Sequence, residues 1–367
     1  MDDTNIRSQN RALNIDEFEK GKLVLSSMPR ALFVELTQNC NLNCPYCKGE
    51  DTQKYRPDLN MQPELFSSVA EKLFPTAELV DLRGSGESTI LKDFSKYVEI
   101  TTDFGVQIRI VTNGMNPNPS IWEQLMASGA IIGISCDTAD PKMFSEIRKG
   151  GNLNRLIKTV KTITKYRNLY SVPVENVYFT CVVSLKNINT LPELIKLAKD
   201  LHLSKIILFP VSLPQSHPWN LKRDIPSVVK GLESAFKISN SLNLTLQLGA
   251  AFDESLRIEK DLKSKCLNPW TYLLIDYSGR VGFCDHLIGN SRFTFDSFYE
   301  KEFDNIWNGW KFKWLRRTHR KGKPSLWFDS CRWCYQMRYV DFEHMFYPKY
   351  LDNIVSNKSR HSFHEKF

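Results

Sequence analysis

The chain of 367 residues lacks the features that would place it in or beyond a membrane. No apolar run approaches the roughly 20 residues of a membrane-spanning helix. The first residues, Met1 to Asn5, are polar and acidic and lack the apolar core of a secretory signal peptide. We therefore expect a cytoplasmic protein with no membrane partner, in which the nine cysteines stay reduced and available to bind a metal.

Histidine is also scarce, with seven in the chain, and none lies near the densest group of cysteines. That group is the segment CNLNCPYC, which contains Cys40, Cys44 and Cys47 and follows the apolar run 31–36. The run predicts a buried strand, so the thiols lie on the loop at its C-terminal end. Three thiolates can bind three irons of a cubane cluster and leave one iron open. A zinc loop, or three unrelated thiols, remains the alternative.

This spacing, with an aromatic residue before the last cysteine, resembles the radical S-adenosylmethionine (radical SAM) enzymes. The resemblance implies that Cys40, Cys44 and Cys47 bind a [4Fe–4S] cluster whose open iron is chelated by S-adenosylmethionine (AdoMet). It also implies that Tyr46 lies near the adenine. Such a cofactor pair supplies a 5′-deoxyadenosyl radical by reductive cleavage of AdoMet.

The fold class expected for residues 31–250 is α/β. Six apolar runs, which predict buried parallel strands, alternate with helical patterns. Six units are too few for a closed eight-stranded barrel, so we predict a partial (β/α)6 TIM-type barrel with its active site at the carboxyl ends of the strands. The predicted strands are 31–37, 78–83, 107–112, 131–137, 176–184 and 205–210. Residues 1–30 are expected to form a poorly structured extension, with a short helix near 16–25, and 349–367 a polar tail.

Further candidates for AdoMet binding follow three of the predicted strands. Strand two ends in Asp81-Leu82-Arg83-Gly84-Ser85-Gly86-Glu87, similar to the family's Gly-Gly-Glu motif, which implies that this turn holds the amino group of AdoMet. Ser85 departs from the commonest form of that motif. The resemblance also implies that Thr112-Asn113-Gly114 forms the family's Thr-Asn-Gly turn. The implied cofactor-binding residues are Tyr46, Ser85, Gly86, Glu87, Asn113, Ser135 and Arg148.

Two of these candidates and their neighbours have a second interpretation. Arg148 is either a partner of the AdoMet carboxylate, which its two-pronged guanidinium suits, or an ordinary arginine on a helix surface.

Strand alternation turns Ser135 and Asp137 into the barrel and Cys136 outward, and it places Cys181 outward in the same way. Cys136 and Cys181 are therefore expected to be core residues. Donation of a hydrogen atom by a cysteine, as in some radical epimerases, is the rival interpretation.

A second cysteine set lies in residues 251–348, where we expect a small α+β iron–sulfur module with a hairpin at 271–276 and 280–284. Four thiolates complete a cluster with no open iron, and a four-cysteine zinc site is the alternative. The set resembles the SPASM and twitch modules of radical SAM enzymes, and its spacing is similar to that of the aminocyclitol dehydrogenase of butirosin biosynthesis. The implied ligands of a second, auxiliary [4Fe–4S] cluster are Cys266, Cys284, Cys331 and Cys334.

Three functions remain open. The first is radical oxidation of a small polar substrate, such as a sugar or an aminocyclitol, with the auxiliary cluster as electron acceptor. Asp137, His217 and His286 are the candidate catalytic groups near the expected mouth of the barrel. The second is modification of a ribosomal peptide by epimerisation or side-chain cross-linking, which the short stretch before residue 31 disfavours because it cannot hold a leader-recognition domain. The third is a non-catalytic iron–sulfur or zinc protein.

The formal charge of +8 indicates the kind of partner to expect. Part of it lies in residues 311–321, where tryptophans are interleaved with lysines and arginines. This pattern is more typical of the solvated face of an amphipathic helix than of a nucleic-acid site. A basic surface also suits an acidic electron donor of the flavodoxin or ferredoxin type.

Overall fold

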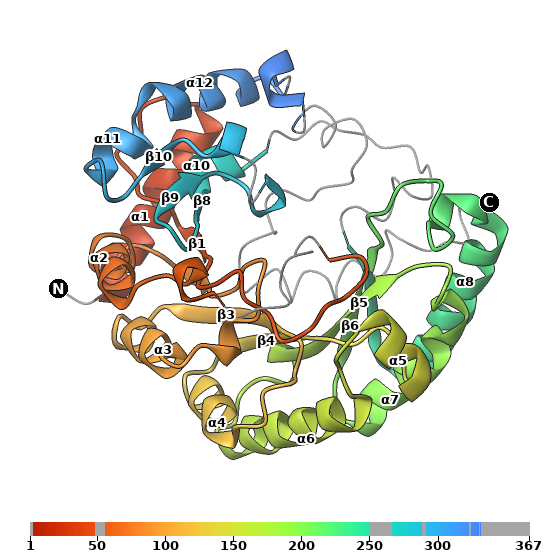
Figure 1. Cartoon of the computed structure of the whole chain (residues 1–367). Helices are drawn as coiled ribbons and strands as arrows, with labels where there is room; N and C mark the ends of the chain where they lie inside the picture. Colours follow the sequence, from red (N-terminus) through yellow and green to blue (C-terminus); the bar gives the residue numbers. More distant parts are fainter. Residues whose placement is uncertain are drawn as a thin grey trace.

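The computed structural model describes residues 3–47, 56–249, 266–287, 291–322, 324–329 and 331. The described strands form one ten-stranded sheet in the order β10-β9-β8-β1-β2-β3-β4-β5-β6-β7. Strands β1 to β7 are parallel neighbours, and helices cover their outer side (Figure 1). This is the expected α/β partial barrel. Cys334 and the polar tail lie outside the described residues.

The barrel alternates strands and helices as the apolar runs predict. Its strands are β1 (Ala31–Val34), β2 (Leu79–Asp81), β3 (Gln107–Thr112), β4 (Ile131–Ser135), β5 (Val177–Val183), β6 (Lys205–Pro210) and β7 (Thr245–Leu248). Its helices are α2 (Pro63–Leu73), α3 (Phe94–Asp103), α4 (Pro119–Ala127), α5 (Pro141–Ile147), α6 (Leu153–Leu169), α7 (Leu191–Asp200) and α8 (Ile225–Ser241).

The helix starts follow from local chemistry. Asn118 before Pro119 and Asp140 before Pro141 each accept a hydrogen bond from a backbone amide of the first turn. Proline suits the first helical position because its missing amide hydrogen would have no partner there. These signals bring the chain back along the sheet after each strand and leave the carboxyl ends of the strands at one edge.

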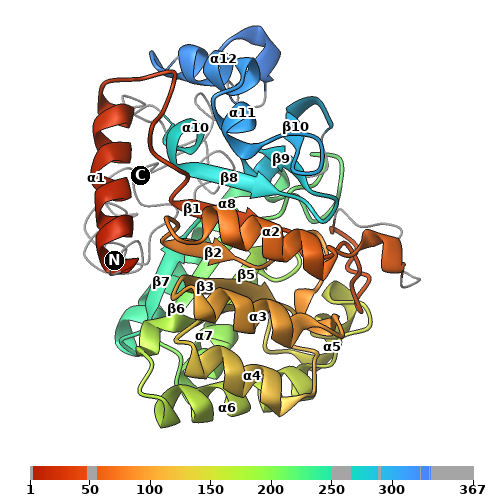
Figure 2. The same cartoon turned by 90° about the vertical axis from the view of Figure 1, so that its left-hand side faces the viewer.

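The N-terminal segment departs from its prediction. Residues Asp3–Glu19 form helix α1, which lies against the C-terminal module (Figure 2). Asn14 donates to the carbonyl oxygen of Trp270 at 2.7 Å and accepts from Thr271 at 2.7 Å, and Phe18 meets the Trp270 ring edge-on. The expectation of a poorly structured extension is therefore wrong. The segment is mostly polar, but Asn14 is fully buried and its side-chain amide is satisfied by residues more than 250 positions away along the chain.

The C-terminal module continues the barrel sheet. It contains α10 (Asn268–Thr271), β8 (Tyr272–Ile275), β9 (Arg280–Gly282), β10 (Asp296–Ser297), α11 (Phe303–Trp307) and α12 (Trp310–His319). The hairpin of β8 and β9 is confirmed, and β8 also pairs in parallel with β1, opposing Tyr272 to Ala31 and Ile275 to Val34. The module therefore extends the sheet at the strand that leads into the cysteine loop. Within the described residues, no helix is long and apolar enough to cross a membrane.

Candidate active site

The loop with three cysteines follows β1 and is held by backbone hydrogen bonds from two directions. The amide of Gly86 donates to the carbonyl of Thr37 at 3.1 Å, and that of Glu87 donates to the carbonyl of Asn39 at 2.8 Å. On the other side, the amide of Asn43 donates to the carbonyl of Lys149 at 2.9 Å. The turn after β2 and the segment after α5 therefore position the cysteine loop at the carboxyl edge of the sheet.

The three thiols differ in exposure. Cys40 and Cys44 are half-buried and pack against the main core, whereas Cys47 is exposed. Burial raises the pKa of the Cys40 thiol to about 11, although the amide of Leu42 donates to its sulfur at 3.5 Å. Burial likewise raises the pKa of Cys44. Cysteine binds a metal as the thiolate, so a cluster would displace the proton from each of these thiols.

The donor set of three thiols on one loop is compatible with an iron–sulfur cluster. Among the described residues, no three His, Cys, Asp or Glu side chains converge closely enough to bind one metal ion. A cubane cluster binds each thiolate to a different iron, so its ligands stay farther apart than those of zinc. Cys40 also receives the side-chain amide of Asn113 at a nitrogen–sulfur distance of 3.7 Å, which places the turn after β3 beside this ligand.

Glu87 connects the turn after β2 to the turn after β3 by hydrogen bonds. It is buried, and its carboxylate accepts from the backbone amide and hydroxyl of Thr89, from the hydroxyl of Thr112 and from the amide of Asn113. Burial raises the pKa of this carboxyl, and these hydrogen bonds oppose the rise. The implied contacts of Ser85, Gly86 and Glu87 with AdoMet stay predictions, because the structure shows only that Gly86 and Glu87 bond to the cysteine loop and Ser85 to Glu35.

Glu35 is a buried acid that sequence reasoning did not single out. Its carboxylate accepts from the amide of Ser85 at 2.9 Å, and its Cγ lies where a Cβ on Gly84 would fall. Burial raises its pKa. An acidic residue inside the apolar run 31–36 was the available signal, since a buried acid needs a specific partner.

Substitution of Gly86 by alanine tests how closely the turn after β2 contacts the cysteine loop. A Cβ here would lie 2.2 Å from the carbonyl oxygen of Asn39 and 2.7 Å from the backbone carbon of Gln38. Backbone cannot yield as a flexible side chain can, so we expect Gly86→Ala to displace the loop, cost about 2–4 kcal/mol in urea unfolding and lower iron retention.

The matched control for this prediction is Gly129→Ala. The added Cβ there has nothing within 4 Å, and the residue only suffers the strain of φ near +70°. A loss of about 1 kcal/mol with full iron retention is expected for the control. Equal iron retention in both variants would contradict the close contact between the two segments.

Asp137 links the cysteine loop to the end of α5 and to β5 through hydrogen bonds. Its side chain is fully buried and accepts from Tyr46 Oη at 2.5 Å, from Arg148 Nε at 2.6 Å and from the amide of Val182 at 2.7 Å. Burial alone would lower the pKa of Arg148, but the Asp137 carboxylate outweighs it and holds that pKa well above its ordinary value. Arg148 is thus a buried ion-pair partner and not a helix-surface residue. Asp137, a candidate catalytic base, is buried and bonded to Tyr46, Arg148 and Val182.

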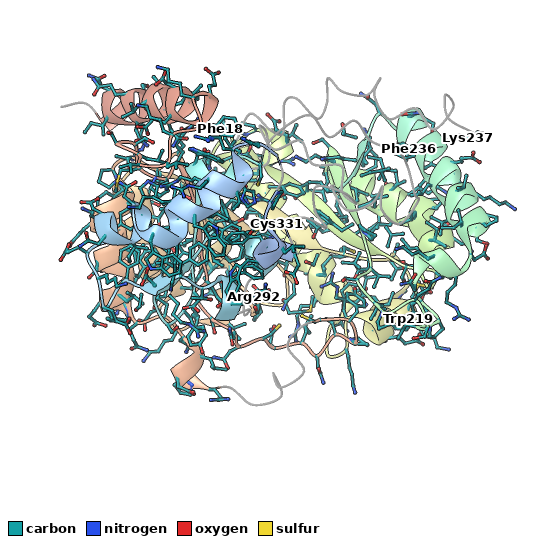
Figure 3. The ribbon with its side chains drawn as sticks, turned by 90° about the horizontal axis from the view of Figure 1, so that it is seen from above. Phe18, Trp219, Phe236, Lys237, Arg292 and Cys331 are labelled. Atoms are coloured by element: carbon teal, nitrogen blue, oxygen red, sulfur yellow. The ribbon has the colours of Figure 1, made fainter. Side chains whose placement is uncertain are left out.

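The remaining candidates are dispersed. Ser135 is half-buried, with its hydroxyl 3.4 Å from that of Thr180, and Cys136 and Cys181 are fully buried in the core as expected. His217 lies on the loop after β6, where its Nδ1 accepts from the amide of Trp219. Figure 3 shows Trp219 at the edge of the molecule, away from the C-terminal module. The side chain of His286 lies outside the described part of the chain.

The second cysteine set is described for three of its four members. Cys266, Cys284 and Cys331 are half-buried, and the latter two pack against the main core. Phe283 and Phe328 precede Cys284 and Cys331 in the sequence, and their ring centroids are 6.0 Å apart. The chain segments that carry these two cysteines therefore meet through their aromatic neighbours.

Comparison with known proteins finds one family model over each cysteine set. Residues 34–198 match the model of the radical SAM superfamily, and residues 266–335 match that of SPASM, an iron–sulfur cluster-binding domain. The chain contains a radical SAM domain and a SPASM domain. These domains imply a [4Fe–4S] cluster with AdoMet and additional iron–sulfur binding, as the cysteine patterns predict.

Curated relatives of this radical SAM–SPASM chain are distant. The mycofactocin maturase MftC of Mycolicibacterium smegmatis is 25% identical over 185 residues, which are 50% of this chain and 44% of the maturase. The chain thus spans less than half the length of this relative. The tungsten-containing aldehyde ferredoxin oxidoreductase cofactor-modifying protein of Pyrococcus furiosus is 23% identical over 85% of this chain and 88% of its own length.

Solved structures share the fold of this radical SAM–SPASM chain. Streptococcus suis SuiB bound to S-adenosylmethionine superposes with a TM-score of 0.63 at 17% identity, covering 84% of this chain and 72% of SuiB. Native anSMEcpe with bound AdoMet has a TM-score of 0.61 at 16% identity, covering 90% of this chain and 100% of that chain. The expected likeness to the aminocyclitol dehydrogenase is weak, because the structure of BtrN reaches a TM-score of only 0.38.

Proposed function

We propose that this protein is a radical SAM enzyme that modifies a peptide. The observation that carries the radical part is the loop of Cys40, Cys44 and Cys47 at the carboxyl end of β1, inside a matched radical SAM domain. The peptide part is supported by relatives: MftC is described as a maturase, and SuiB has been solved with the precursor peptide SuiA. A peptide therefore replaces a sugar or aminocyclitol as the first substrate class to test.

The residues of the barrel have defined tasks in this proposal. Cys40, Cys44 and Cys47 hold a [4Fe–4S] cluster, which together with AdoMet supplies a 5′-deoxyadenosyl radical. Asn113 orients Cys40 through its side-chain amide, and Tyr46 is held by its hydrogen bond to Asp137. Gly86 and Glu87 shape the turn against which AdoMet is expected to lie. Cys266, Cys284, Cys331 and Cys334 hold one auxiliary [4Fe–4S] cluster.

Iron content and AdoMet cleavage test this proposal before any substrate is known. After anaerobic reconstitution with iron and sulfide, we expect about eight irons per chain, from two four-iron clusters, and 5′-deoxyadenosine on reduction with dithionite and AdoMet. About four irons with cleavage would leave the C-terminal cysteines without a cluster. No cleavage would return the protein to the class of non-catalytic metal-binding proteins.

The substrate class is tested separately with deuterium. Candidate precursor peptides, and in parallel a panel of aminocyclitols, are prepared with deuterium at their carbon-bound positions. Transfer of deuterium into 5′-deoxyadenosine from a peptide and not from the aminocyclitols is the expected result. Transfer only from a small polar molecule would support oxidation of that molecule instead.

A further inference from the structure

The C-terminal module presents an exposed face of tryptophans and cations. Trp310, Leu326 and Trp327 have exposed fractions of 67%, 77% and 49%. The rings of Trp310 and Trp314 stack at 6.4 Å, and those of Trp314 and Trp327 lie 5.8 Å apart, so the three form one continuous strip. Large apolar side chains exposed together usually mark an interaction site. We call this strip, with Leu326, Lys313 and Arg317, the Trp310 face.

The charge of this face has a single sign along α12. Trp310, Lys313, Trp314 and Arg317 recur at helical spacing, whereas Phe312 and Leu315 are buried on the inner side. Residues 310–321 contain no Asp or Glu. Within the described residues, Lys313 and Arg317 form no ion pair, whereas nearby Arg292 stacks on Trp327 and pairs with Asp329 at 3.4 Å. An aromatic centre with such a rim is complementary to an acidic partner.

The face lies next to the chain segments that carry two auxiliary cysteines. Trp314 contacts Phe328 at a centroid distance of 5.0 Å, and Phe328 contacts Phe283 at 6.0 Å. Phe283 directly precedes Cys284, and Phe328 is three residues before Cys331. Figure 3 shows Arg292 and Cys331 in the same part of the module. Two ring contacts therefore connect the exposed strip to the residues beside these thiols.

We propose that the Trp310 face is the docking surface for an acidic electron-transfer protein. The proposal rests on the auxiliary cluster of the proposed function, and it adds the place where a redox partner binds. Acidic side chains of the partner pair with Lys313 and Arg317, and its apolar surface covers Trp310 and Trp327. Each encounter passes one electron from the hydroquinone of a flavodoxin to the iron–sulfur centre, which leaves the flavin as the semiquinone and changes no bond in the protein.

Stopped-flow spectroscopy with fully reduced flavodoxin tests this surface, with formation of the flavin semiquinone as the readout. We expect K313E/R317E to slow electron transfer at least tenfold at low ionic strength, and high salt to slow the wild type similarly. Reduction by the 5-deazariboflavin radical, a small reagent that light generates with EDTA as the sacrificial electron donor and that needs no docking, should be unchanged. Iron content and dithionite-driven cleavage of AdoMet report separately on the proposed function.

The matched control is K196E/K199E on α7, which makes the same change in net charge at two exposed lysines of the barrel. Lys199 lies in the last turn of α7, as Arg317 lies in the last turn of α12. Full activity of this control with flavodoxin is expected. Equal rates in the test variant and the wild type, or equal loss in both variants, would overturn the proposal. Loss of binding to phosphatidylglycerol vesicles with unchanged flavodoxin rates would assign the face to a membrane surface instead and would also overturn it.

If the charge reversals reduce the iron content, Trp310→Ala provides a second test. Trp310 is exposed at the start of α12, so its removal disturbs little of the core. A slower flavodoxin reaction with an unchanged deazariboflavin reaction is expected. Unchanged rates with both reductants would overturn the proposal in this variant as well.

Discussion

Replacing Cys40, Cys44 and Cys47 with alanine will abolish formation of 5′-deoxyadenosine, a loss of at least a thousandfold. In the proposed function each thiolate binds a different iron, so without the three of them no protein ligands would remain at this loop to hold the cluster. The fold should survive, because Cys40 and Cys44 are only half-buried and Cys47 is exposed. Anaerobic assay of 5′-deoxyadenosine by liquid chromatography, with circular dichroism of the same samples, measures both results.

The matched variant replaces Cys331 and Cys334 instead. We expect it to lose about four of eight irons and to retain a measurable part of AdoMet cleavage while losing turnover of substrate. Cleavage that vanishes in this variant without unfolding would show that the two cysteine sets act as one unit. Full substrate turnover would remove any essential role of the auxiliary site.

Asp137→Asn will destabilise the protein by about 3–5 kcal/mol, because it leaves the buried guanidinium of Arg148 without a compensating charge. The carboxylate oxygens that Asp137 offers accept from three groups, and an asparagine amide replaces one of these oxygens with a donor. Loss of the hydrogen bond to Tyr46 should also loosen the cysteine loop and lower iron retention. Urea unfolding at neutral pH and iron analysis are the measurements.

A double-mutant cycle with Arg148→Met decides whether the ion pair is the cause. Removing both charges takes away the unpaired cation, so the double variant should lose less stability than the sum of the two single variants. Strict additivity would mean that Asp137 acts through Tyr46 and Val182 alone. The same cycle separates two roles for Arg148: a structural role lowers stability, whereas a role at the AdoMet carboxylate raises the KM for AdoMet in well-folded protein.

Substitutions in the Trp310 face and substitutions in the cysteine loop are expected to have different effects. The loop is held by backbone hydrogen bonds to the turn after β2 and to the segment after α5, so substitutions near it are expected to change both stability and chemistry. The exposed groups of the face have few neighbours to lose. Substitutions there should change the rate of reaction with a redox partner and leave folding nearly untouched.

The sequence by itself determined the local elements, and it predicts which cysteines bind the clusters. The apolar runs predict the barrel strands, and alternation along β4 and β5 predicts that Cys136 and Cys181 are buried, because side-chain direction in a strand has a period of two residues. The spacing of Cys40, Cys44 and Cys47 in one loop predicts the first iron–sulfur site, and the resemblance of residues 266–334 to known auxiliary-cluster modules implies the second. The strands, the alternation and the first cysteine loop depend on neighbours within a few residues, whereas the second cysteine set is spread over residues 266–334.

Only the tertiary structure decided which distant groups satisfy one another. The pairing of β8 with β1, the contacts of α1 with Trp270 and the bridge from Tyr46 through Asp137 to Arg148 join residues separated by 11 to more than 240 positions. The sequence does not show whether a polar side chain such as that of Glu87 or Asn14 faces water or a buried hydrogen-bond partner. Their roles follow from the free energy of burying them with a partner, and that partner is defined only once the chain has folded.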